Sequence, residues 1–438
     1  MAGHGCESYL AYGSALVHFI SKDQQRQQDA CDLKEQKLAA EWQRHALRGK
    51  LPRPGKLKQL IRQGVPRDLR RWVWMETSGA AQLRAGSVKG YFERHAKSAQ
   101  HSDQSKEARR QIALDLPRTF PHHAWLKTEE GQLKLGRVLY AYCMHNTTVG
   151  YCQGLNCVAG FLLIVTESDE DAFWLLVALV EKILYADTYA SNLTGCHVEM
   201  RTLGSLVQSK MPLFSDHLAR VSCDISMFAT DWFLCLFCTS CPSDVAARIW
   251  DALFSEGPKV LFRVSMALLL KCEAECLKFD NAGEIMQAVK QATLTIHDRE
   301  ELMKAAFNDV RKFPMAKIEE IRQQQYSAVM AMLAEREAIR ARREERERQQ
   351  QLRADKERQR REEAEREMDS GIDDLTDAER LALELRVGLK KELINVGQGL
   401  RQVVNSVHGI LKEVPGRMQV TYQQAVGSVQ DRAGTSNH

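Results

Sequence analysis

The sequence predicts an all-α protein with a large helical domain, a long charged helix and an amphipathic, heptad-patterned C-terminal helix. Two runs in the first part carry helix-start signals. Ser168 and Asp171 have capping-box spacing at the start of an apolar run. Pro242 and Ser243 precede the run 245–254, whose apolar residues recur at helical spacing. The alternation of apolar and polar residues that indicates strands is nearly absent.

Composition divides the 438 residues into four expected parts. Nearly all the tryptophans, phenylalanines and prolines lie before residue 320, so a packed core is expected there. The expected parts are a helical, partly flexible extension over 1–56, the large helical domain over 57–320, a highly charged single helix or coiled coil over 321–370, and a heptad-patterned helix with a flexible tail over 371–438.

The charged part is densest between Glu335 and Glu367, where twenty-three of thirty-three residues are charged. Twelve are basic and eleven acidic, and no apolar seam runs through them. Pairs such as Glu344–Arg348 and Glu357–Arg361 have the favoured i,i+4 order with the acid first. The pattern indicates a solvated single helix that acts as a spacer, with a partner-binding coiled coil as the alternative.

The C-terminal part begins with a capping box at Thr376 and Glu379. Its apolar residues then step alternately by four and three, which is a heptad seam. They are Leu389, Leu393, Val396, Leu400, Val403, Val407, Ile410 and Val414. We expect self-association or a partner helix through 335–414. An amphipathic helix folded back on its own domain and a membrane-surface helix are the alternatives.

Charge and cysteine usage exclude several classes of protein. The net charge is only +4 and no basic cluster carries interleaved aromatics, so no nucleic-acid partner is expected. The longest apolar runs, 155–166 and 260–270, are shorter than the roughly 20 residues of a membrane span. The apolar patch 9–20 lacks a basic leader and resembles a signal peptide poorly. Twelve irregularly spaced cysteines suggest a reduced, cytoplasmic protein.

Several catalytic or metal motifs are absent or weak. There is no G-x-x-x-x-G-K-[ST] or G-x-G-x-x-G run, so the chain does not resemble a nucleotide-binding enzyme. Cys235, Cys238 and Cys241 have metal-ligand spacing, but they lie in an apolar stretch. On a helix they would share a buried face, so we interpret them as core residues. Cys152 with His145 would make a nucleophile and base, although no local signature supports that pair.

A more informative stretch is 111–125, QIALDLPRTFPHHAW. Asp115 and Arg118 are three residues apart, so the carboxylate is within reach of the guanidinium. Pro117 and Pro121 stiffen the chain on both sides of Arg118. A braced arginine on a stiff segment suits the delivery of a positive fork to an anionic group. The alternative is a structural Asp–Arg pair at a helix end.

A second informative stretch is 149–156, VGYCQGLN, where Gln153 lies in a glycine-flanked turn. An amide titrates poorly, but it can orient a water molecule by donating and accepting hydrogen bonds. In GTP hydrolysis by small GTPases, an arginine supplied in trans neutralises charge on the transferring phosphoryl group, and a glutamine orients the attacking water. Arg118 and Gln153 together therefore suit GTPase activation.

These residues resemble the TBC family of Rab GTPase-activating proteins. The family signature I-x-x-D-x-x-R is similar to Ile112–Arg118, and Y-x-Q-G-[ML]-N is similar to Tyr151–Asn156. Further similar pieces follow in order: LIRQGVPRDLRRWVW at 60–74, FWLL at 173–176, WFLCLF at 232–237 and RIWDALFSEG at 248–257. The run AFNDVRKFPMAKI at 306–318, followed by a charged helix, is most similar to the TBC domain family member 2 (Armus-type) subgroup.

The resemblance implies a helical TBC domain and a dual-finger mechanism. Arg118 would be the arginine finger, and Gln153 would position water in place of the GTPase's own glutamine. Supporting roles would fall to Asp115, which would orient Arg118, and to Thr119, Tyr151, Gly154 and Asn156. An arginine finger contributes about 10³–10⁵ in rate. The magnesium ion and GTP would belong to the bound Rab, so this chain would need no cofactor and no metal site.

The function implied is Rab GTPase activation in trans, and through it the regulation of vesicle trafficking. The chain would not turn over a substrate of its own. Its partner would be a GTP-loaded Rab, and it would be a cytoplasmic protein recruited peripherally to endosomal or Golgi membranes. The alternative is a non-catalytic scaffold that binds GTP-loaded Rab and recruits partners through its C-terminal coiled coil.

Overall fold

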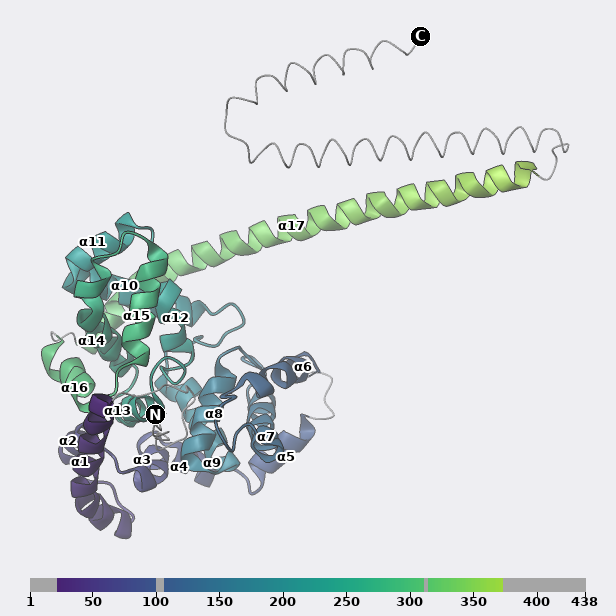
Figure 1. The fold of residues 1–438 in the computed structure, drawn as a ribbon. Coiled ribbons are helices and arrows are strands. Elements are labelled where there is room, and N and C mark those ends of the chain that lie inside the picture. Colours follow the sequence, from purple (N-terminus) through teal and green to yellow (C-terminus); the bar gives the residue numbers. More distant parts are fainter. Residues whose placement is uncertain (1–21, 100–105, 311–313, 373–438) are drawn as a thin grey trace, which may run out of the picture. The chain divides into compact units, whose positions relative to one another are not determined.

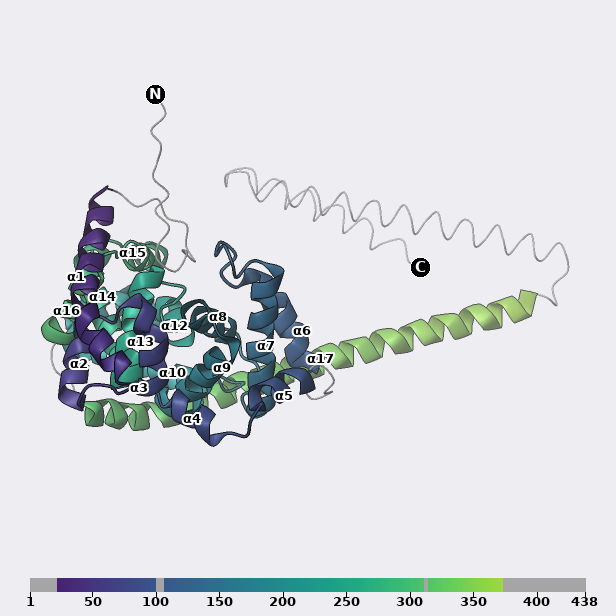
Figure 2. The ribbon, with the colours of Figure 1, turned by 90° about the horizontal axis from the view of Figure 1, so that it is seen from below.

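The structure is a computed structural model that describes residues 22–99, 106–310 and 314–372 (Figures 1 and 2). Every regular element in these ranges is helical, which confirms the all-α prediction. The described residues up to Ala338 form one compact unit, and those from Ile339 onward form a second. Within the described ranges, no helix combines the length and apolar character that crossing a membrane requires.

Apart from the last one, the α-helices described in the first unit are 6 to 26 residues long. Its first half contains α1 (Lys22–Leu47), α2 (Pro54–Gln63), α3 (Arg70–Thr77), α4 (Ala80–Gly86), α5 (Tyr91–Ser98), α6 (Lys106–Asp115), α7 (Glu129–His145), α8 (Leu155–Thr166) and α9 (Asp169–Ala178). Its second half contains α10 (Thr194–Lys210), α11 (Pro212–Arg220), α12 (Ser226–Leu234), α13 (Ser243–Glu256), α14 (Lys259–Cys276), α15 (Ala282–Leu294), α16 (Arg299–Lys304) and the start of α17 (Met315–Ile372).

The predicted helix starts are confirmed. Ser168 is the N-cap of α9, and its hydroxyl accepts a hydrogen bond from the Asp171 N–H at 3.3 Å. Pro242 precedes α13, which is buried from Ser243 to Phe254. A helix buried on all sides belongs in the centre of a domain. Helices α3, α8 and α13 meet there around an aromatic cluster of Trp74, Phe161, Trp250 and Phe254.

A buried polar network links α1 and α3 to α13. Asp251 of α13 is fully buried and accepts hydrogen bonds from Arg70 Nε at 3.1 Å and from Trp74 Nε1 at 2.8 Å. Arg70 is itself 2% exposed and also pairs with Glu35 of α1. Buried charges are stable only when they are paired in this way, so the network holds α1 on the domain.

Asp251→Ala is expected to lower the free energy of unfolding by about 3–5 kcal/mol, because it removes the buried carboxylate that accepts from both Arg70 and the Trp74 indole. Urea denaturation of the full chain measures this change. Glu275→Ala, which removes an exposed ion pair with Lys278, is the control and should cost less than about 1 kcal/mol. Equal losses in the two variants would show that the network does not hold the helices together.

The cysteine-rich stretch after α12 does not continue the helix. Helix α12 ends at Leu234, and both Leu236 and Phe237 have positive φ angles, 49° and 66°. The expected helical face of Cys235, Cys238 and Cys241 is therefore wrong. The three thiols are nevertheless buried, as expected of core residues. The Trp250 indole donates to the Leu236 carbonyl at 2.7 Å and holds the turn on the core.

Helix α17 begins within the first unit. Arg322 is 2% exposed, and its guanidinium forms two hydrogen bonds with Glu199 of α10, at 2.6 and 2.9 Å. A bidentate pair between buried groups fixes both position and orientation. The first turns of α17 are therefore part of the domain core.

From Ile339 to Glu363 every side chain of α17 is exposed, as predicted for a solvated helix. Its i,i+4 ion pairs are Arg340–Glu344, Arg343–Glu347 and Arg358–Glu362. These place the base first, whereas the sequence suggested the acid-first pairs Glu344–Arg348 and Glu357–Arg361. The heptad residues Leu389–Val414 and the capping box at Thr376 lie outside the described residues, so association through them stays a prediction.

Candidate functional site

The arginine segment is a sharp turn at the end of α6. Helix α6 ends at Asp115 and passes into a 3₁₀ turn, Leu116–Arg118, in which Pro117 occupies an early position that tolerates a missing N–H. Thr119 is then extended and 2% exposed, and Phe120 is buried with a φ of 45°. Arg118 is exposed and forms no hydrogen bond or ion pair with the described residues. The turn is thus anchored by its neighbours and presents the guanidinium to solvent.

The glutamine segment joins α7 to α8. Gly150 and Gly154 have φ angles of 59° and 100°, which non-glycine residues rarely adopt. A Cβ on Gly154 would lie 3.2 Å from the Leu234 carbonyl oxygen, so the segment packs tightly on the end of α12. Gln153, between Tyr151 and Gly154, is exposed, and its side-chain amide has no hydrogen-bond partner among the described residues.

A chain of hydrogen bonds connects the two segments. The Tyr151 hydroxyl donates to Asp115 Oδ2 at 2.6 Å, and Asn156 Nδ2 donates to Thr119 Oγ1 at 2.8 Å. Thr119 Oγ1 in turn donates to the Asp115 carbonyl at 2.8 Å. The Gly154 N–H donates to Asn156 Oδ1 at 3.2 Å. The five predicted supporting residues thus form one network between Arg118 and Gln153.

The network changes the expected role of Asp115. The sequence suggested that its carboxylate would orient Arg118, but among the described residues these two side chains form no ion pair. The carboxylate instead accepts from Tyr151. Burial, together with this hydrogen bond, raises the pKa of the Tyr151 hydroxyl, which therefore stays protonated as a donor. Asp115 ties the arginine segment to the glutamine segment and leaves the guanidinium available.

Gly160 is a contributor that the motifs did not indicate. It lies in α8, where a Cβ would approach the Thr119 Cγ2 to 2.9 Å and the Phe120 ring to 3.2 Å. The helix backbone therefore passes directly against the buried anchor of the arginine segment. A glycine inside an apolar helical run was the only sequence signal for this close approach.

The alternative of a cysteine nucleophile finds no support. Burial raises the pKa of the Cys152 thiol to about 11, so the reactive thiolate is scarce at neutral pH. The thiol donates to the Gln153 carbonyl at 3.4 Å. His145 interacts instead with the Tyr91 hydroxyl at 2.9 Å and with Glu181 at 3.2 Å. Cys152 and His145 therefore bond to different partners and do not form a nucleophile–base pair.

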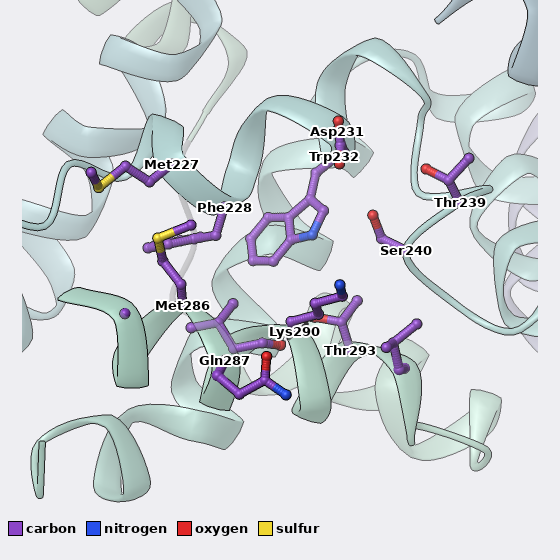
Figure 3. A pocket seen from close by; sticks show the side chains of 13 residues that line it. Met227, Phe228, Asp231, Trp232, Thr239, Ser240, Met286, Gln287, Lys290 and Thr293 are labelled. Carbon is purple, nitrogen blue, oxygen red and sulfur yellow. Dashed lines mark hydrogen bonds between the residues drawn. The ribbon is translucent and has the colours of Figure 1, made fainter. Parts of the chain in front are cut away.

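A pocket of about 700 Å³ lies between α12 and α15 (Figure 3). It is named here the α12–α15 pocket. The Trp232 indole occupies its centre in the view of Figure 3, with methionine side chains to one side and hydroxyl groups to the other. The lining residues are Met227, Phe228, Asp231, Trp232, Thr239, Ser240, Gly283, Met286, Gln287, Val289, Lys290, Thr293 and Leu294.

Under the GTPase activation that the resemblance implies, Thr119→Val is expected to slow stimulated hydrolysis by about 10²-fold, the scale on which a displacement of about 1 Å affects reacting groups. Valine keeps the shape of threonine but leaves Asn156 without its acceptor. Thr119→Ser keeps the oxygen and should retain most of the activity. Single-turnover GTP hydrolysis compares the two variants. Equal rates would show that the Thr119 hydroxyl does not position the segments.

Comparison with known proteins places this fold and these segments in a family. Residues 67–277 match the Rab-GTPase-TBC domain model. The chain is 39% identical to TBC1 domain family member 2A of Mus musculus over 288 residues, which are 65% of this chain and 31% of that protein. It is 36% identical to TBC1 domain family member 2B of Homo sapiens over 65% of this chain and 30% of that protein. The chain thus spans about a third of the length of these relatives.

A shorter relative and two solved structures extend the comparison. Growth hormone-regulated TBC protein 1 of Xenopus laevis is 39% identical over 54% of this chain and 69% of its own length. The Chlamydomonas flagellar RabGAP TBC domain superposes with a TM-score of 0.63 and 40% identity, over 69% of this chain and all of that one. The GAP domain of Gyp1p, at 23% identity and a TM-score of 0.51 over 59% of this chain and 92% of that one, shares the fold. The chain therefore belongs to the Rab-GTPase-TBC domain family.

Proposed function

We propose that this protein activates Rab-type small GTPases by inserting Arg118 and Gln153 into the active site of the GTP-loaded partner. The observation that carries the proposal is the network between the two segments. It ties their buried residues together while both long polar side chains remain exposed and without partners. A buried network that anchors the backbone beside two exposed polar side chains holds those side chains at a fixed place on the surface, which favours a role toward another molecule.

The chemistry follows from the two side chains. Charge develops on the phosphoryl oxygens during transfer, and the planar Arg118 guanidinium can donate two parallel hydrogen bonds to them. The Gln153 amide can accept from the attacking water and donate to a phosphoryl oxygen. Neither residue has to titrate. The magnesium ion and the nucleotide belong to the GTPase, so this chain acts in trans as an activator.

The network preorganises the two segments, because it orders them before the GTPase binds. Backbone segments that are held before binding cost less conformational entropy at the moment of reaction. The backbones on either side of Arg118 and Gln153 are fixed by buried Thr119, Asn156 and Gly154. Only the two long side chains then remain to be ordered.

We further propose that this activity regulates vesicle trafficking. The protein would be cytoplasmic and would be recruited peripherally to endosomal or Golgi membranes.

Single-turnover GTP hydrolysis across a panel of Rab-type GTPases tests the proposal. The full chain should accelerate at least one GTPase well above its intrinsic rate. The scaffold alternative instead requires binding to the GTP-loaded form without acceleration. Measuring binding and hydrolysis on the same panel separates the two functions, and acceleration of no GTPase would contradict catalysis.

A further inference from the structure

The α12–α15 pocket combines an apolar floor with charged groups at its edge. Met227 is 49% exposed, and Phe228 and Met286 are only partly buried. Asp231 and Lys290 are exposed and form no ion pair with the described residues. Figure 3 shows them on opposite sides of the Trp232 indole. Monomeric proteins leave such mixed pockets open chiefly where something binds.

Helix α12 lines the pocket and ends beside the glutamine segment. The carbonyl of Leu234, the last residue of α12, lies 3.2 Å from the position that a Cβ on Gly154 would take, and Asp231 lines the pocket one turn earlier. One helical turn is about 5.4 Å. In both ribbon views α12 lies between α15 and α8, whose first residue follows the glutamine segment (Figures 1 and 2). A protein that covers Gln153 can therefore also cover the pocket, because α12 connects the two places.

The size of a specific interface also requires contacts beyond Arg118 and Gln153. A standard protein–protein interface buries about 800 Å² on each partner and involves about 20–30 residues a side. Two side chains supply only a small part of that area. The surface around the fingers must supply the rest, and the α12–α15 pocket offers a concave, partly apolar portion of it.

We propose that the α12–α15 pocket is a docking site for the substrate GTPase and receives one of its apolar side chains between Asp231 and Lys290. The proposal rests on the proposed function, because it assigns the pocket to the same partner. Met227 and Met286 provide flexible, polarisable walls that adapt to side chains of different shape. Asp231 and Lys290 favour a partner that places a positive charge near Asp231 and a negative charge near Lys290, and they disfavour a partner with the reverse arrangement. The pocket thus contributes to the choice of GTPase, whereas Arg118 and Gln153 perform the chemistry.

Met227→Asp tests the proposal in the full chain. A carboxylate in this apolar wall should weaken docking without altering Arg118 or Gln153. We expect the GTPase concentration for half-maximal acceleration to rise about tenfold or more, the scale of a buried interface residue, while the rate at saturation stays within about twofold. Lys290→Glu, at an exposed position, provides a second variant with the same expected split.

Met330→Asp is the matched control, because Met330 is 41% exposed on α17 and does not line the pocket. It should change neither parameter. Thermal unfolding of all variants checks that each is folded. Binding of GTPase loaded with a non-hydrolysable GTP analogue is measured alongside hydrolysis and should weaken by the same factor in Met227→Asp and Lys290→Glu.

The outcomes separate this proposal from the proposed function. If the wild-type chain accelerates a GTPase and both pocket variants retain its half-saturating concentration, docking at the pocket is wrong and activation stands. If the wild type binds a GTPase without acceleration, activation is wrong, and the binding measurements alone decide on the pocket. If the wild type binds no GTPase of the panel, both proposals are overturned.

Discussion

Arg118→Ala should reduce the stimulated rate of GTP hydrolysis by about 10³–10⁵, the contribution of an arginine finger supplied in trans. The reason is local to the transition state. Arg118 is exposed and has no partner within the described chain, so its removal breaks no interaction of the fold. The loss should appear in the rate at saturation rather than in folding stability. Single-turnover hydrolysis with saturating activator measures it directly.

Two further variants sharpen the test of Arg118. Arg118→Lys keeps the positive charge but loses the planar fork, so it should recover only a small part of the rate. Arg110→Ala removes another exposed arginine, on α6, and should leave the rate unchanged. A general electrostatic attraction between activator and GTPase would instead make Arg110→Ala and Arg118→Ala similar. That result would contradict a finger at Arg118.

The helix starts were predictable because their signals are local. Ser168 caps α9 through an atom three residues away, and Pro242 marks the start of α13 within the same short stretch. The motif residues around Arg118 and Gln153 were assigned by resemblance, and the structure brings their supporting residues into one network. Local helix signals therefore sufficed to predict the fold class, and the family pattern sufficed to name the candidate site residues.

The partner of Asp115 was not predictable from sequence. Spacing placed Arg118 within its reach, but the carboxylate bonds to Tyr151, which is 36 residues further along the chain. Which of two available donors a carboxylate selects depends on burial and on the path of the backbone. The turn at Leu236 and Phe237 has the same cause, since positive φ at non-glycine residues comes from tertiary packing rather than from local preference.

The sequence also did not predict the α12–α15 pocket. Its walls come from helices about 50 residues apart, and neither helix alone indicates a concave surface. Exposed Met227 and half-buried Phe228 become notable only when α15 is placed beside them. A concave surface built from distant helices needs the tertiary structure to be seen, whereas the candidate residues Arg118 and Gln153 were found by their motifs.

Gln153→Ala should reduce the stimulated rate by about 10²–10³, the usual effect of removing one preorganised hydrogen-bonding group from a transition state. The Gln153 amide has no partner in the described chain, so the loss should again leave stability unchanged. Gln153→Glu keeps the shape but places a negative charge beside the phosphate, so it should be at least as slow. Gln208→Ala, an exposed glutamine on α10, is the matched control.

A GTPase whose own catalytic glutamine is replaced by alanine gives the sharper test of Gln153. If Gln153 orients the water, this GTPase should remain responsive to the wild-type chain, although its intrinsic hydrolysis is impaired. The same GTPase should then lose nearly all stimulation by Gln153→Ala, because no amide remains to hold the water. Full stimulation of that GTPase by Gln153→Ala would exclude a glutamine finger. Loss of stimulation by the wild-type chain would assign the water to the GTPase and leave Arg118 as the single finger.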